Sequence, residues 1–75
     1  MTPAQHELQA IILSLFSKAL GQPVTAQDDF FAIGGDSLAA EQVLAGLSAA
    51  VSQDLPGWML LDHPSAETLA QALCP

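Results

Sequence analysis

The chain has 75 residues, of which eight are acidic and one, Lys18, is basic, so its formal charge is −7. A chain this short forms one small domain, and its excess of acid argues against binding to nucleic-acid phosphates. The single Cys74 excludes an internal disulfide, and no cysteine–histidine cluster has the spacing of a zinc site. Because no apolar run reaches the length of a membrane span, we expect one cytoplasmic domain over residues 1–75, without membrane, nucleic acid or resident metal.

The first predicted helix follows Thr2, the expected N-cap, with Pro3 as the first helical residue and Gln5 at the capping-box position. Its apolar residues recur at helical spacing: Leu8, Ile11, Ile12, Leu15, Phe16, Ala19 and Leu20. Gly21 is the natural end of this helix. His6 falls outside the apolar stripe, so we interpret it as an exposed polar residue.

Residues 22–36 contain one proline and two glycines and show no helical periodicity, which predicts a long loop. Four apolar residues argue against disorder in this loop: Val24, Phe30, Phe31 and Ile33. We expect Phe30 and Ile33 in particular to be buried anchors that pin the loop across the helices.

The second helix is predicted to begin at Ser37. One apolar stripe follows at helical spacing: Ala40, Val43, Leu44, Leu47 and Val51. The other sides are mostly small and uncharged: Leu38, Ala39, Glu41, Gln42, Ala45, Gly46, Ser48 and Ala49. Gly46 costs about 1 kcal/mol of helix stability relative to alanine, so it either permits a close approach of another element or is merely tolerated.

Pro56 and Pro64 bracket a segment long enough for only one or two helical turns. Ser65 is the expected N-cap of a last helix, with Glu67 in its first turn. The inner face of that helix is predicted to carry Leu69, Ala70 and Leu73. The fold class is therefore all-α: a small bundle of three main helices and one short helix, joined by a long ordered loop.

The run FFAIGGDSL, Phe30 to Leu38, places Ser37 where a glycine-rich turn gives way to helical periodicity. The first backbone N–H groups of a helix have no intrahelical partner, and the helix dipole favours negative charge there. A phosphate attached to Ser37 would therefore sit in an anion site. The alternative is that Ser37 is an ordinary N-cap serine.

With Leu20-Gly21 before it and Leu55-Pro56 and Pro64-Ser65 after it, this run resembles the attachment motif of peptidyl and acyl carrier proteins, over residues 4–73. The resemblance implies a carrier-protein-like helical bundle. It also implies a 4′-phosphopantetheine arm, taken from coenzyme A and bound covalently to Ser37, with Gly35, Asp36 and Leu38 around the attachment point. The doubled phenylalanine and glycine are more similar to peptidyl carriers of nonribosomal peptide synthesis than to fatty-acid carriers.

The sequence departs from the family pattern at several positions. Many peptidyl carriers have histidine where Asp36 stands, and Leu61 stands where the family often has phenylalanine. The second helix lacks the basic residue often found in its middle, and Trp58-Met59 is bulkier than usual. These departures concern which enzymes bind the chain, and leave the class unchanged.

By the same resemblance, the protein is a monomeric, non-catalytic carrier that holds aminoacyl or acyl groups as thioesters. Its implied partners are a phosphopantetheinyl transferase and the adenylation, condensation, thioesterase or other tailoring domains of nonribosomal peptide or related polyketide biosynthesis. Mg²⁺ is needed only during transfer of the arm, when the Ser37 hydroxyl attacks the coenzyme A pyrophosphate and the adenosine bisphosphate portion is released. The transferase supplies most of the base and metal site. Asp36 is expected to cap the helix and to help arrange that magnesium.

We expect partner enzymes to be recognised by apolar contact around Leu38, Gln42 and Ala45, with Trp58 or Met59 beside these residues. Trp58 and Met59 are equally compatible with the core and with a partner contact, because tryptophan is rarely fully buried and is enriched at interfaces. Cys74 is expected to be a free thiol beyond the last helix.

Two other functional classes remain as alternatives. The string GDSL also occurs in serine esterases, which would make Ser37 a nucleophile with Asp62 and His63 as partners. Against this, such enzymes need a strand before the serine, a different spacing of the acid and the base, and a sheet that 75 residues cannot supply; His63 is then an exposed loop residue. The second alternative is a purely structural helical interaction module.

Overall fold

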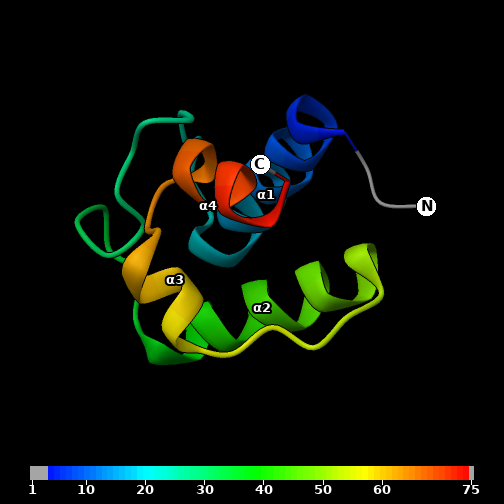
Figure 1. The fold of residues 1–75 in the computed structure, drawn as a ribbon. Helices are drawn as coiled ribbons and strands as arrows, with labels where there is room; N and C mark the ends of the chain where they lie inside the picture. The colour runs from blue at the N-terminus through cyan, green and yellow to red at the C-terminus, as the bar shows by residue number, and fades with distance from the viewer. Residues whose placement is uncertain (1–3, 75) are drawn as a thin grey trace.

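The computed structural model describes residues 4–74 and contains four helices: α1 (Gln5–Leu20), α2 (Ser37–Val51), α3 (Trp58–Asp62) and α4 (Ala66–Leu73). No strand occurs within this range, so the predicted all-α class is confirmed, as are the three longer helices, the short one and the long loop after α1 (Figure 1). None of these helices combines the length and apolar character that crossing a bilayer requires.

The start of α1 differs from the prediction, whereas its end agrees. Ala4 is the N-cap and offers no side-chain hydrogen bond, and Gln5 is the first helical residue, so its predicted capping-box position is wrong. The predicted cap at Thr2 and Pro3 lies outside the described residues. At the other end, Gly21 adopts a left-handed conformation with φ 67° and donates its N–H to the Ser17 carbonyl, which confirms the predicted stop.

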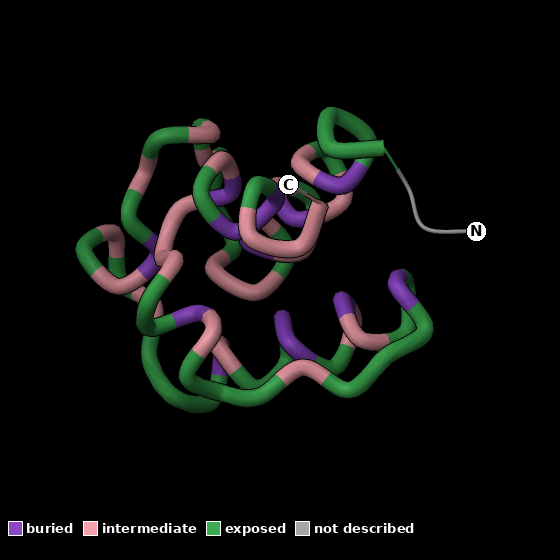
Figure 2. Tube along the Cα trace, viewed as in Figure 1, coloured by how far each residue is buried: buried purple, intermediate pink, exposed green. Residues whose placement is uncertain are grey.

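The core lies where α1 packs against both α2 and α4. Buried positions face inward on each of these helices, with exposed positions on the outside (Figure 2). The fully buried large side chains are Leu8, Ile12 and Phe16 of α1, Phe30 of the loop, Val43 and Leu47 of α2, Leu60 of α3 and Leu69 of α4. Burial of this apolar surface provides most of the driving force for folding.

On α2 the buried face is shifted from the predicted stripe. Val43, Leu44, Leu47 and Val51 are buried as expected, but Ala39, assigned to the outer side, is also buried, while Ala40 is half-buried. The physical reason is that α1 covers the flank of α2 that carries Ala39 and Gly46. A Cβ atom on Gly46 would lie 2.7 Å from Cδ2 of Leu15, so the glycine permits a close approach of α1.

The loop between α1 and α2 is fixed to the α3–α4 connection. The Phe30 N–H donates to the Pro64 carbonyl over 2.8 Å, and the Glu67 N–H donates to the Ala26 carbonyl over 3.0 Å. Phe30 is fully buried, which confirms its role as an anchor. Ile33 is only half-buried and is not among the side chains packed on the core, so it is a weaker anchor than predicted.

Helix α4 begins as predicted. The Ser65 hydroxyl accepts a hydrogen bond from the Thr68 N–H, and Thr68 Oγ1 accepts one from the Ser65 N–H, which makes a complete capping box. Leu69 and Ala70 are buried and Leu73 is half-buried. Cys74 follows the helix, half-buried and packed against the core, so its thiol is less exposed than a free tail thiol.

Candidate functional site

Ser37 is the first residue of α2, and its side chain is exposed. The residue before it, Asp36, caps the helix: its Oδ1 accepts a hydrogen bond from the Ala39 N–H over 2.9 Å, and its carbonyl accepts one from the Ala40 N–H over 2.9 Å. The interpretation of Ser37 as an ordinary N-cap is therefore wrong, and the predicted capping by Asp36 is confirmed. No described hydrogen bond uses the Ser37 hydroxyl, which is left available for chemistry.

Capping by Asp36 also reduces the number of backbone N–H groups that the predicted anion site offers. The carboxylate already occupies the Ala39 N–H and brings negative charge to the helix start. Within residues 4–74, the N–H groups of Ser37 and Leu38 remain without an acceptor. A phosphate on Ser37 would therefore have these two donors, beside a carboxylate, rather than the whole helix terminus.

Each of the two positions before Asp36 requires glycine, for a different physical reason. Gly34 has φ 113°, a conformation that only glycine adopts without strain. Gly35 lies so close to Phe30 that a Cβ atom there would overlap the phenylalanine ring, and its N–H donates to the Phe30 carbonyl over 2.9 Å. The motif thus turns the chain tightly around a buried ring and presents Ser37 at the surface.

A groove of about 230 Å³ opens beside Ser37 between α2 and α3, and we call it the α2/α3 groove. It is lined by Phe31, Ser37, Ala40, Glu41, Leu44, Gly57 and Leu61. An exposed hydroxyl at the mouth of a mainly apolar groove fits the covalent attachment of a flexible arm. Glu41 is the one ionisable side chain in this lining.

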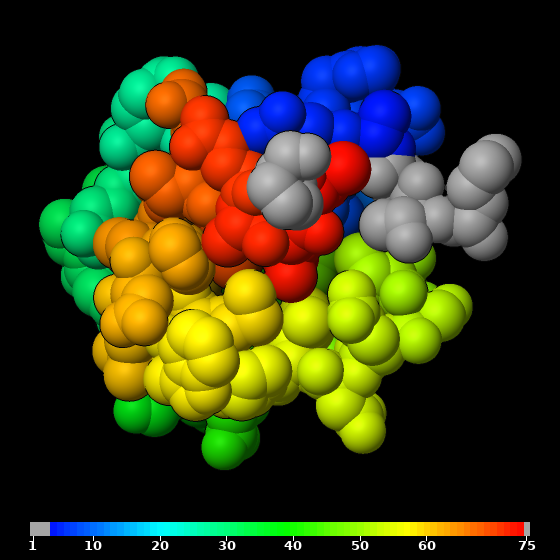
Figure 3. All heavy atoms as spheres, viewed as in Figure 1, coloured from blue at the N-terminus to red at the C-terminus, as the bar shows by residue number. Residues whose placement is uncertain are grey.

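Four of the five predicted partner residues are exposed, and Met59 is the exception. Leu38 is 65% exposed and Trp58 56% exposed, and Gln42 and Ala45 are also exposed. Met59 is half-buried and packs against the core, so the structure separates it from Trp58. In Figure 3 the chain around α3, coloured yellow to orange, forms the surface above α2.

Leu61 lies beside Ser37 and was not among the residues predicted from the sequence. It is 66% exposed and lines the α2/α3 groove together with Ser37. The signal in the sequence was its spacing of three from Trp58, which places both side chains on one side of a helix.

The residues that a serine hydrolase would need are not assembled around Ser37. Neither Asp62, at the end of α3, nor His63, which follows it, lines the groove at Ser37. No hydrogen bond in the described part of the chain joins Ser37 to either residue. His63 is half-buried, not exposed as expected, and its N–H donates to the Met59 carbonyl over 2.9 Å. Residues 4–74 hold no group of three or more side chains able to bind a metal ion.

Comparison with known protein families gives a match over residues 10–73 to the family described as phosphopantetheine attachment site. Among curated proteins, the chain is 37% identical over 67 residues to isonitrile lipopeptide synthase of Mycobacterium tuberculosis, a match that covers 88% of the chain and 3% of that protein. It is 39% identical over 69 residues to phenyloxazoline synthase MbtB of the same species, covering 92% of the chain and 5% of that protein. The chain therefore spans only a small part of these relatives.

Two solved structures have closely similar folds. The free-standing peptidyl carrier protein of an Acinetobacter baumannii secondary metabolic pathway aligns with a TM-score of 0.87 and 26% identity, over 93% of this chain and 91% of that one. The type-II acyl carrier protein BlmI of Streptomyces verticillus, involved in bleomycin biosynthesis, aligns with a TM-score of 0.88 and 23% identity, over 92% and 84%. The second likeness shows the fold alone.

Proposed function

The chain belongs to the phosphopantetheine attachment site family, and we propose that Ser37 is the residue to which its 4′-phosphopantetheine arm is attached. The observation that supports this most strongly is the position of the Ser37 hydroxyl. It is exposed at the first residue of α2, has no hydrogen-bond partner in the described chain, and lies at the α2/α3 groove. Gly35, Asp36 and Leu38 shape the attachment point around it.

The bound arm supplies a terminal thiol that holds an acyl group as a thioester. This chain contributes the nucleophilic oxygen of Ser37 and a rigid helix start. A serine hydroxyl needs a base to become a good nucleophile, and no described side chain accepts a hydrogen bond from it. We therefore assign the base, and most of the Mg²⁺ site, to the transferase that loads the arm, with Asp36 beside the reacting oxygen.

The domain is a carrier of the type found in nonribosomal peptide synthetases. Carrier domains of this family are generally non-catalytic. We propose that it performs no reaction itself and presents aminoacyl or acyl thioesters to adenylation, condensation, thioesterase or tailoring domains. We also propose that loading takes place in the cytoplasm, where coenzyme A is available, and that the chain acts as a monomer.

We propose that these enzymes dock on one surface formed by Leu38, Gln42, Ala45, Trp58 and Leu61, and we call it the docking surface. Its support is the exposure of three large apolar side chains, Leu38, Trp58 and Leu61, of which Leu38 follows Ser37 directly and Leu61 lines the α2/α3 groove with it. Tryptophan is enriched among the few residues that contribute most of the binding energy of an interface. Met59, packed on the core, is assigned to positioning α3 beneath this surface.

Incubation with coenzyme A, Mg²⁺ and a broad-specificity phosphopantetheinyl transferase tests the carrier function. We expect one phosphopantetheine per chain, and no hydrolysis of small activated esters above the level of the Ser37→Ala variant. A chain that stays unmodified while well folded, or ester turnover that depends on both Ser37 and His63, would contradict the proposal.

A further inference from the structure

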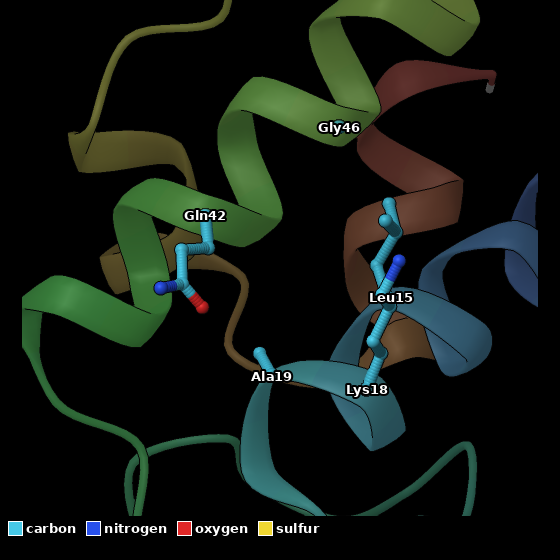
Figure 4. Close-up of a pocket in the computed structure, with 5 residues that line it drawn as sticks. All are labelled: Leu15, Lys18, Ala19, Gln42 and Gly46. Atoms are coloured by element: carbon cyan, nitrogen blue, oxygen red, sulfur yellow. The ribbon is translucent and has the colours of Figure 1, made fainter.

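A second groove lies on the opposite flank of α2, between α2 and α1. One part, of about 390 Å³, is lined by Leu15, Lys18, Ala19, Gln42 and Gly46 (Figure 4). Another part, of about 260 Å³, shares Ala19 and Gln42 and continues to Asp36 and Leu38, the neighbours of Ser37. We call the two parts together the α1/α2 groove.

The part of this groove beside Gly46 is mainly apolar, with Lys18 and Gln42 as its polar side chains, whereas the part that reaches Asp36 is mainly polar. Because Gly46 has no Cβ atom, Leu15 packs against the α2 backbone and exposes part of its side chain to the groove. Figure 4 shows Gln42 projecting from α2 toward α1, and Lys18 extending along the same side of α1 as Leu15. Neither the Gln42 amide nor the Lys18 ammonium makes a hydrogen bond to residues 4–74.

The charge of the groove differs from that of the rest of the chain. Lys18 is the only basic residue in a sequence with eight acidic ones. It lines one end of the groove, while Asp36, whose carboxylate caps α2, lines the other. An acidic group approaching this protein is repelled by the net charge and finds its one local attraction at Lys18.

We propose that the α1/α2 groove binds an acidic segment of a partner protein, with a carboxylate paired to Lys18 and an adjacent apolar side chain against Leu15 and Gly46. This inference rests on the proposed function, because Leu38 and Gln42 belong both to the groove and to the docking surface. A partner docked on α2 would thus be held in one orientation by the only lysine or arginine side chain of the carrier.

Lys18 also has a simpler role available, since a basic residue in the last turn of α1 interacts favourably with the helix dipole. The two roles differ in what they predict. A purely structural role affects melting alone, whereas the binding role makes affinity depend on the sign of the ligand's charge.

The test is a titration of the full, unmodified ¹⁵N-labelled chain with the capped peptide acetyl-Leu-Leu-Glu-Leu-amide, followed by NMR. Matched peptides carry Gln or Lys in place of Glu. We expect the amides of Ala19, Gln42 and Gly46 to shift. We also expect the Gln peptide to bind up to about fivefold more weakly, the range for one solvent-exposed ion pair, and the Lys peptide to bind more weakly still.

Two variants complete the test. Lys18→Gln should remove the preference for the Glu peptide, while Gln71→Glu, which lowers the net charge equally from exposed α4, should keep it. Lys18→Glu should reverse the preference toward the Lys peptide, a result that loss of α1 stability cannot produce. Shifts confined to Trp58 and Leu61, no shifts, or equal binding of the three peptides would overturn the proposal. Because the titration uses unmodified protein, its failure leaves attachment at Ser37 unaffected.

Discussion

The ring of Phe30 packs against the ring of Phe16 with a centroid distance of 4.7 Å, so the loop that leads to Ser37 is joined directly to the core of α1. Phe31 meets Phe30 edge-on at 5.3 Å and extends this contact to the wall of the α2/α3 groove. Tilted and edge-on aromatic pairs are favourable beyond their buried area. The Ser37 hydroxyl is therefore exposed, while the loop that leads to it is anchored by Phe30, one of the fully buried side chains.

The first prediction concerns Gly35, whose added Cβ would overlap the Phe30 ring. Gly35→Ala should lower the free energy of unfolding by about 1–3 kcal/mol, the usual cost of overpacking, as measured by urea denaturation. The matched control is Gly57→Ala, where no atom lies within 4 Å of the new Cβ and φ is −59°. That control should change stability by less than about 0.5 kcal/mol; equal effects of the two variants would argue against the close packing at Gly35.

The second prediction separates the capping role of Asp36 from its charge. Asp36→Ala should cost about 1 kcal/mol of stability because the Ala39 N–H loses its acceptor. Asp36→Asn should retain most of that stability, since asparagine caps as well as aspartate. Thermal melting of both variants checks this. If Asn destabilises as much as Ala, the charge rather than the hydrogen bond is responsible.

The third prediction concerns the end of α2, where Ser52 has a left-handed conformation with φ 56°. Ser52→Gly should raise the free energy of unfolding by about 0.5–1 kcal/mol, because a left-handed conformation costs about 1–2 kcal/mol for a residue with a Cβ, and glycine loses part of this gain to unfolded-chain entropy. Gln53→Gly adds the same backbone flexibility at the adjacent residue but relieves no positive φ, so it should not raise the free energy of unfolding. A gain in the control and none at Ser52 would contradict the assigned conformation.

The helix periods and the Ser37 motif allowed most of the fold to be predicted from the sequence. The stripe Val43, Leu44, Leu47 and Val51 fixed one face of α2, and Gly21 and Ser65 marked helix boundaries correctly. Ala39 was assigned to the wrong side of α2, because its small side chain carries little hydrophobic signal and its burial depends on where α1 packs. Tertiary packing decided that position.

At the site, the position of Ser37 was predictable and the environment of a phosphate was not. The sequence favoured an open helix terminus, but the backbone geometry brings Asp36 Oδ1 onto the Ala39 N–H. The different burial of Trp58 and Met59 also escaped prediction, because adjacent residues of a five-residue helix have no periodicity to separate them. Both depend on local geometry that composition does not encode.

The fourth prediction tests the docking surface. Ala45→Glu places a charge on an exposed residue of the proposed docking surface, where burial in an interface would be costly. It should leave circular dichroism and melting nearly unchanged and should slow single-turnover loading of the modified carrier by its partner enzymes. Gln71→Glu, an exposed change of equal charge on α4, is the control and should load at the parent rate. Equal rates for the parent and for Ala45→Glu would place docking elsewhere.

Intact-protein mass spectrometry after incubation with coenzyme A, Mg²⁺ and a broad-specificity transferase tests the central claim most directly. The parent chain and the control variant Ser14→Ala, altered at an exposed serine of α1, should each gain the mass of one phosphopantetheine. The Ser37→Ala variant, shown by circular dichroism to be folded, should gain none. A folded Ser37→Ala chain that still acquires this mass would move the attachment site to another residue and contradict the account.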